Sequence, residues 1–372
     1  SSQACTLGQC LTSSFAGGNE REGAAYDAVS EPVLSADGAH AAYFAKRGGK
    51  GFLVIDGREI PAPFFYERLK PVFSRDWRTF AYLAIKDRKQ FIVVDGKESP
   101  LYDDLSGFAL SPDGEIVAYG ALKSGKWRLV VNGNEGPEYD SVDAVQFASE
   151  ARHVVFRAMR DGKRCMVIAD LKAKVVREGP MFDEIWAPSF DTEGRLGYGA
   201  LAGQEIWWKV LPEAGEKPTF NTIPTKLATI PAEYQPGEIV FSGDGRRVVY
   251  AAQKEGKWLV IEGERAGKSY DNVHDLVFSP DSQNVAYAAR MQGKYFVVAN
   301  GKEGKGYESL GKSGFSPAKN LLFYEAQQGG KWLMVVNGKE SRPFDMAWAP
   351  PLFNSDERHI AYIEQHYNRK KN

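Results

Sequence analysis

The alternation of apolar runs and turn residues between Phe278 and Leu310 predicts four short strands. Val285–Tyr287 and Tyr295–Val298 are rich in β-branched and aromatic residues, which favour strands. Ser279–Asp281 and Asn300-Gly301 separate such runs. Proline fixes φ, and Gly and Asn accept positive φ, so these residues reverse the chain within a few positions. Because Asn-Gly between apolar runs is a strong hairpin signal, the stretch predicts an antiparallel four-stranded meander.

This unit recurs along the whole chain, and each copy can be aligned on the turn that follows its first strand. Successive anchors are 37 to 42 residues apart, except for an interval of 51 residues between the fifth and the sixth. Four antiparallel strands repeated about every 40 residues are typical of a β-propeller blade. We therefore predict an all-β fold, a single β-propeller of nine four-stranded blades, with eight blades as the alternative. The nine anchors are Ser35, Ser74, Ser111, Ser149, Asp191, Ser242, Ser279, Ser316 and Ser355.

The two ends of the chain predict how the propeller closes. The last anchor is followed by a second strand only, whereas residues 22–29 resemble a fourth strand with no repeat before it, and residues 11–15 could supply the third. We expect residues 1–25 to complete the last blade in part, so that an N-terminal strand closes it. Residues 26–372 then form the propeller domain, since closure protects strand edges.

The fifth repeat departs from the pattern. It lacks the Asn-Gly turn and carries a proline-containing insertion at residues 212–236. Long insertions in repeat proteins often bind ligands, but they also cost little in loop-closure entropy. We favour a tolerated surface insertion.

Composition limits the function classes. The 372 residues are 43% hydrophobic, and 47 basic against 48 acidic residues give a net charge of −1. No overall field is expected to attract nucleic acid, and no apolar run is long enough for a transmembrane helix. The chain opens with Ser1 and shows no signal peptide, so we expect a processed or trimmed chain. Cys5 and Cys10 form either a disulfide, which fits an exported protein, or two free thiols; Cys165 is expected to be buried in a strand.

Motifs for catalysis or metal binding do not stand out. The sequence holds no GxSxG, and none of its five histidines forms HExxH. The aspartate of the SPDG-type turns is expected to accept backbone N–H groups rather than bind calcium, which needs more oxygen ligands. Aromatic–acid pairs such as Tyr139-Asp140 recur in most repeats, so we assign them to packing and to hydrogen bonds between blades. We predict no catalytic residue, no metal site and no cofactor.

One set of charged residues could form a functional surface. In an up-and-down meander the second-to-third turns of all blades lie on one face, and these turns carry lysine. Such a face could dock an acidic partner or an anionic glycan; the alternative, which we favour, is that Gly-Lys makes a soluble hairpin whose lysine stem covers the next aromatic residue. The candidate binding residues, called the lysine rim below, are Lys50, Lys89, Lys126, Lys163, Lys257, Lys294 and Lys331.

The repeat resembles a known family. Its recurring elements, FSPD at Phe278, VAY at Val285 and GKW with VVNG from Gly330, are similar to the TolB-like and WD-repeat-like propeller repeats of bacterial exported proteins. The resemblance covers residues 26 to 363 and implies a propeller fold and a periplasmic or extracellular location. It implies no catalytic residues, because no hydrolase domain accompanies the repeats.

Two function classes follow from this interpretation. The first is a non-enzymatic scaffold or binding protein that engages a protein or peptide through a face or the channel, either alone or within a larger extracytoplasmic assembly. The second is a channel-centred enzyme, such as a lyase, lactonase or oxidoreductase. Fold alone does not choose between them. We favour binding, because the predicted innermost strands, such as Val72-Phe73 and Leu276–Phe278, are mostly apolar.

Overall fold

The structure, a computed structural model, describes residues 12–13, 21–22, 25–30, 32–35, 37–65, 70–148, 153–172, 174–191, 193–211, 224–347, 352–353, 360–361 and 364–365. Cys5, Cys10 and residues 212–223 of the predicted insertion lie outside these residues. The chain divides into two compact units. Unit one spans Ser1–Met181, and unit two runs from Phe182 to Asn372, apart from part of the undescribed segment 212–223.

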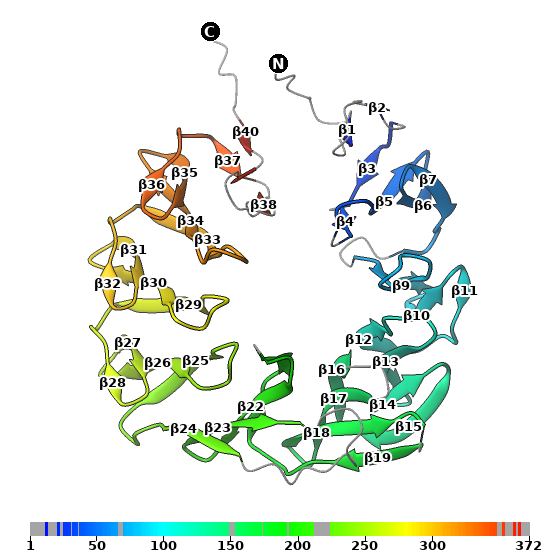
Figure 1. Cartoon of the computed structure of the whole chain (residues 1–372), viewed down its shortest axis with the longest axis horizontal. Helices are drawn as coiled ribbons and strands as arrows, with labels where there is room; N and C mark the ends of the chain where they lie inside the picture. Colours follow the sequence, from blue (N-terminus) through cyan, green and yellow to red (C-terminus); the bar gives the residue numbers. More distant parts are fainter. Residues whose placement is uncertain are drawn as a thin grey trace. The chain divides into compact units, whose positions relative to one another are not determined.

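Unit one holds a hairpin and four antiparallel sheets (Figure 1). The hairpin pairs β1 (Thr12–Ser13) with β2 (Arg21–Glu22). Sheet 1 contains β3 (Ala28–Val29), β4 (Val33–Leu34), β5 (Ala41–Arg47), β6 (Lys50–Ile55) and β7 (Arg58–Pro61); sheet 2 contains β8 (Val72–Phe73), β9 (Phe80–Lys86), β10 (Lys89–Val94) and β11 (Lys97–Glu98); sheet 3 contains β12 (Asp104–Leu110), β13 (Val117–Lys123), β14 (Lys126–Val131) and β15 (Asn134–Tyr139); sheet 4 contains β16 (Ser141–Phe147), β17 (His153–Arg160), β18 (Lys163–Asp170) and β19 (Val175–Glu178).

Unit two repeats the same plan. Sheet 5 contains β20 (Glu184–Ile185), β21 (Ser189–Phe190), β22 (Leu196–Ala202), β23 (Glu205–Val210) and β24 (Thr225–Thr229); sheet 6 contains β25 (Gln235–Phe241), β26 (Val248–Lys254), β27 (Lys257–Glu262) and β28 (Arg265–Ala266); sheet 7 contains β29 (Asn272–Phe278), β30 (Val285–Met291), β31 (Lys294–Ala299) and β32 (Lys302–Glu303); sheet 8 contains β33 (Ser309–Phe315), β34 (Leu322–Gln328), β35 (Lys331–Val336) and β36 (Lys339–Glu340). Two short pairs follow, β37 (Met346–Ala347) with β40 (Glu364–Gln365) and β38 (Leu352–Phe353) with β39 (Ile360–Ala361).

The sheets are the predicted blades. Each complete sheet pairs its strands in chain order, and the second strands are buried on both faces, as in the BBBBB pattern at the start of β22 and β26. Between sheets 1 and 2, for example, Phe44 and Leu53 pack against Tyr82 and Phe91. A single sheet cannot bury two faces, and stacking against its neighbours does so. The chain is thus an all-β protein of the β-propeller class, with about eight blades.

The structure corrects two details and leaves closure as a prediction. Ala28–Val29 pairs with β5 and opens sheet 1, so it is not part of a fourth strand. In sheet 4 the first turn starts at Ala148, whose N–H donates to His153 O, one residue before the predicted anchor. Eight sheets are complete among the described residues, and the ninth repeat is described only by its first two strands, each in two pieces.

The first strand of most sheets is irregular. Its register against the second strand shifts in sheets 3, 4, 6, 7 and 8, and it is split in two in sheets 1 and 5. Gly107, Ala144 and Asp275 take positive φ values of 44°, 51° and 56° at these shifts. Such β-bulges insert one extra residue and re-aim its side chain. In each unit the first strands lie along one edge of the stack of sheets (Figure 1).

Candidate binding site on the first-strand edge of unit two

The serine and aspartate of the first-to-second turns stabilise the turn itself. Ser111 Oγ donates to Asp113, and Asp113 Oδ1 accepts the N–H of Glu115 at 3.1 Å. Ser111 Oγ accepts the N–H of Ile116 at 2.9 Å. The hydrogen bond from Ser111, followed by that from Glu115, lowers the pKa of Asp113. The predicted turn role of this aspartate is confirmed. Among the residues that the structure describes, no group of three His, Cys, Asp or Glu side chains is arranged to hold a metal ion.

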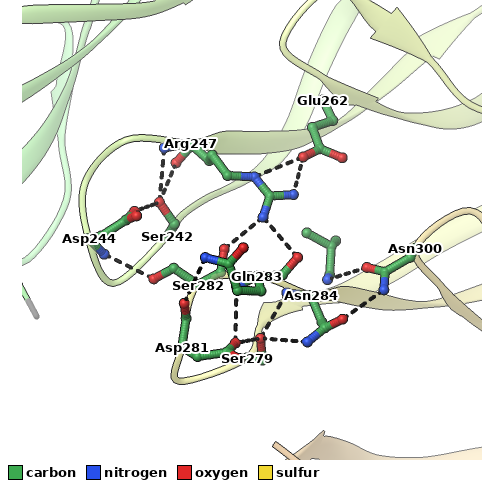
Figure 2. A network of polar contacts seen from close by, with 11 residues as sticks. Ser242, Asp244, Arg247, Glu262, Ser279, Asp281, Ser282, Gln283, Asn284 and Asn300 are labelled. Atoms are coloured by element: carbon green, nitrogen blue, oxygen red, sulfur yellow. Dashed lines mark hydrogen bonds and ion pairs between the residues drawn. The ribbon is translucent and has the colours of Figure 1, made fainter.

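Neighbouring turns also bind one another. Figure 2 shows the contact between sheets 6 and 7, where Arg247 Nη1 donates to the carbonyl oxygens of Ser282 at 2.7 Å and Gln283 at 3.0 Å. Arg247 Nε donates to Glu262 Oε1 at 3.0 Å, and Ser282 Oγ accepts the N–H of Asp244 at 3.0 Å. Backbone groups that the turns leave without a strand partner are thereby satisfied. We assign this network to holding the sheets together.

The acid of an aromatic–acid pair can connect two consecutive sheets, as Asp103, Asp140 and Asp271 do. Asp140 Oδ1 lies 2.7 Å from Lys126 Nζ of sheet 3, and its Oδ2 accepts the N–H of Asp161 of sheet 4 at 2.9 Å. The Lys126 contact, and then the Asp161 N–H, lower the pKa of Asp140. Equivalent bonds from second-to-third turns reach Asp27, Asp103, Asp183, Asp271 and Glu308. The predicted inter-blade hydrogen bonds are confirmed.

The aromatic partner of the pair makes a second link. Tyr139 Oη donates to Glu178 Oε1 at 2.9 Å, and Tyr307 Oη donates to Glu340 Oε1 at 2.8 Å. Arg160 Nη1 also donates to Glu178 Oε2 at 2.8 Å. Burial raises the pKa of Tyr307 strongly, with the Glu340 carboxylate adding to the effect. The recurring polar residues are thus used to join the sheets.

The structure places the seven residues of the lysine rim as predicted, at the first position of a third strand, and all seven are exposed. Four of them form ion pairs with the acid that follows their sheet: Lys89 with Asp103, Lys126 with Asp140, Lys257 with Asp271, and Lys331 with Asp345. A carboxylate beside each ammonium group cancels much of its field at a distance. The charge available for docking on this face is therefore smaller than the sequence suggests.

Charged side chains that do not follow the repeat lie at the bulges of unit two. Glu238 stands at the register shift of β25, Asp275 at that of β29 and Lys312 at that of β33. All three are exposed. At the corresponding position sheet 2 has Lys70, which is also exposed, whereas sheets 3, 4 and 5 have Gly107, Ala144 and Ala187.

The acidic part of this edge is compact. Glu238 Oε2 accepts the N–H of Leu276 at 3.1 Å, which is the amide that joins Asp275 to Leu276. His274 Nδ1 lies 2.9 Å from Asp275 Oδ2, and the two side chains are 39% and 58% exposed. The Glu238 carboxylate of sheet 6 therefore binds the backbone N–H that directly follows the His274–Asp275 pair of sheet 7. These side chains can accept hydrogen bonds from a cationic group or exchange protons with a ligand.

The basic part lies one sheet further along. The N–H of Lys312 donates to Glu325 Oε2 at 3.3 Å. Gly311 leaves the room for this contact, since a Cβ there would lie 2.3 Å from Glu325 Oε2. The Glu325 carboxylate thus satisfies an amide at the bulge, while the exposed Lys312 side chain adds a positive charge next to sheet 7. We call Glu238, His274, Asp275 and Lys312 the bulge site.

Sequence reasoning missed the bulge site, because the first strands were judged to be mostly apolar. A fixed offset would have found it: Glu238, Asp275 and Lys312 each lie four residues before their anchors, Ser242, Ser279 and Ser316. The same offset also selects Glu31 before Ser35 and Lys70 before Ser74, whereas Gly107 stands there before Ser111.

Cys165, predicted to be a small buried residue, is indeed a buried free thiol. Burial raises its pKa to about 11. It therefore stays protonated at neutral pH and is a poor nucleophile.

Comparison with known proteins adds distant likenesses. No protein-family model matches the sequence, and no curated protein matches it. Among solved structures, the chain is similar to dihydro-heme d1 dehydrogenase NirN (15% identity, TM-score 0.44, covering 84% of this chain and 72% of that one) and to the Dos1 propeller (11%, 0.41, 82% and 90%). It is also similar to TolB from Acinetobacter baumannii (14%, 0.31, 74% and 78%). All are remote, so the fold assignment depends on the strand pairing described above.

Proposed function

We propose that this chain is a non-enzymatic β-propeller scaffold or binding protein that engages a protein or peptide partner. The partner contacts the first-strand edge of unit two, at the bulge site. We place the protein in the periplasm or outside the cell, alone or as a subunit of a larger assembly, as the resemblance of its repeats implies. No helix among the described residues is long and apolar enough to cross a membrane.

The observation that supports this proposal is the contrast between constant and variable positions within one chain. The turn serines, the acids that follow each sheet and the tyrosine–glutamate pairs recur and bind neighbouring sheets. The residues at the bulges differ from sheet to sheet and are exposed in unit two. A rigid repeated frame that carries variable exposed residues is the arrangement that binding proteins use.

Site-specific photo-crosslinking tests the proposal. A benzophenone amino acid is placed at Asn272 on β29, at Lys294 on the lysine rim, or at Lys302 on the outer strand β32, all of which are exposed. We expect one protein or peptide from the cells that make this chain to crosslink through position 272, and the purified partner to bind again. If no partner crosslinks above the level of the position 302 control, the binding function is wrong. Crosslinking through position 294 alone would move the site to the lysine rim.

A second candidate function is favoured by one specific contact. The hydrogen-bonded pair His274–Asp275 has the groups that a general acid–base reaction needs, and Glu238 binds the N–H of the next residue, Leu276. The alternative is therefore an enzyme, a lyase, lactonase or oxidoreductase, at the same edge. Assays with lactones and with uronate-containing oligosaccharides test it: turnover that His274→Ala abolishes would support an enzyme, and turnover unchanged in that variant would exclude this site.

A further inference from the structure

The bulge site has an order of charge along the sheets. Sheet 6 contributes Glu238, sheet 7 contributes Asp275 with His274, and sheet 8 contributes Lys312. Because the strands β25, β29 and β33 follow one another along one edge of unit two (Figure 1), the sign changes in one direction. Negative charge lies at sheets 6 and 7, and positive charge lies at sheet 8.

The geometry of the acidic end favours a cationic group. Glu238 of sheet 6 accepts the N–H of Leu276, the residue that follows Asp275 of sheet 7, so each of the two sheets contributes an exposed carboxylate at this contact. Glu238 uses Oε2 for the Leu276 N–H, and Asp275 uses Oδ2 for His274, so each has a second oxygen that can accept a hydrogen bond. A lysine or arginine side chain that binds these oxygens would form charge-assisted hydrogen bonds.

The bulges also determine how a peptide can bind. A regular edge strand offers a row of N–H and C=O groups to which a partner strand can add. Here each first strand is interrupted by a bulge, and bulges protect edges against such pairing. Recognition must therefore depend on the side chains at the bulge site rather than on strand addition.

We propose that the bulge site binds a peptide segment in which a basic side chain and an acidic side chain follow one another. The basic side chain binds Glu238 and Asp275, and the acidic side chain binds Lys312. This inference rests on the proposed function and names the chemistry of the partner's contact segment. Such a segment, with its basic side chain, differs from the acidic partner that the lysine rim would attract.

Short synthetic peptides with blocked termini test the proposal on the full chain. Four fluorescent probes share a Gly/Ser/Gln frame and carry a lysine together with a glutamate in either order, a lysine alone, or neither charge. Fluorescence polarisation at low salt should show one lysine–glutamate order binding most tightly, the lysine-only probe more weakly and the neutral probe not at all. Raising the salt to the physiological level should weaken binding, since exposed charges are screened.

The variants are chosen to keep the fold. E238Q/D275N removes both negative charges, while the amide oxygen introduced at position 238 can still accept the Leu276 N–H; we expect affinity to fall about tenfold or more. K312Q should reduce binding of the lysine–glutamate probe and leave that of the lysine-only probe unchanged. The control E255Q/E264Q removes two exposed acids of sheet 6 that lie away from the bulges and should not affect either probe.

Three results would overturn the inference. They are equal binding of all four probes, a loss of affinity in E238Q/D275N that the control variant reproduces, or a lysine-only probe that binds as tightly as the better lysine–glutamate probe. A partner that crosslinks through position 272 and binds E238Q/D275N as tightly as the original chain would contradict only this inference. In that case the proposed binding function would stand.

Discussion

The link between Tyr139 and Glu178 provides a quantitative test of how the sheets are held together. Tyr139 is 1% exposed, and its hydroxyl donates to Glu178 Oε1 at 2.9 Å. A hydrogen bond to a charged group contributes about 1.5–3 kcal/mol. The Glu178 side chain is 29% exposed and also binds Arg160, so water and the arginine replace part of this. We therefore expect Tyr139→Phe to lower the free energy of unfolding by about 1 kcal/mol.

The repeat itself offers the steric control. Phe182 and Phe344 occupy the corresponding position and are buried, so a phenylalanine fits there and the loss can be assigned to the hydroxyl. Urea unfolding followed by circular dichroism measures the change, which corresponds to a shift of about 2–4 °C in Tm for a unit of this size. A double-mutant cycle with Glu178→Gln should give a coupling energy of about 1 kcal/mol. A change within about 0.3 kcal/mol for Tyr139→Phe, or no coupling, would refute this account.

Three further predictions concern single residues. Lys209 is buried, and burial lowers its pKa. We expect Lys209→Val to raise the free energy of unfolding by about 1 kcal/mol at neutral pH. In alkaline buffer the gain should be smaller, because the lysine loses its charge there. Trp77 has a φ of 59° and stacks on Phe73 and His40. Trp77→Gly should lower Tm, because the lost packing outweighs the relieved backbone strain of about 1 kcal/mol. A higher Tm would contradict this. Hydrogen bonds from Lys305 and Tyr307 lower the pKa of Glu340. The contribution of Glu340 to stability is therefore complete above its unfolded pKa of 4.5 and is lost as pH falls. Glu340→Gln should flatten the acid limb of the curve of unfolding free energy against pH, measured by urea titration.

The turns were the most predictable part of the fold. Asn132 and Gly133, for example, both take positive φ, at 45° and 81°, as the Asn-Gly sequence predicts. Asn132 Oδ1 also accepts the N–H of Val117 at 2.9 Å, which ties the turn between β14 and β15 to the start of β13. Because these preferences depend on a few neighbouring residues, they can be recognised in sequence alone.

The contacts between sheets were predictable only as a type. Recurrence of Tyr139-Asp140 indicated that such pairs join blades, and the structure confirms it. The choice of partners was not predictable, because Glu178 lies 39 positions away in the chain. The same limit applies to the lysine rim: Lys126 could be placed on a turn, but its ion pair with Asp140 depends on the way the chain crosses to the next sheet.

The bulge site could not be predicted, for a physical reason that also makes it a good candidate for function. Strict alternation assigns every second residue of a strand to one face, and one extra residue reverses that assignment from the bulge onward. His274 and Leu276 would share a face in a regular strand, yet the shifted register leaves His274 half-exposed and Leu276 buried. The bulge releases Asp275 from the ladder, so its side chain can change without disturbing the sheet. At such a position the side chain of one blade can change to suit a ligand, while the strand pairing that stabilises the repeat stays the same.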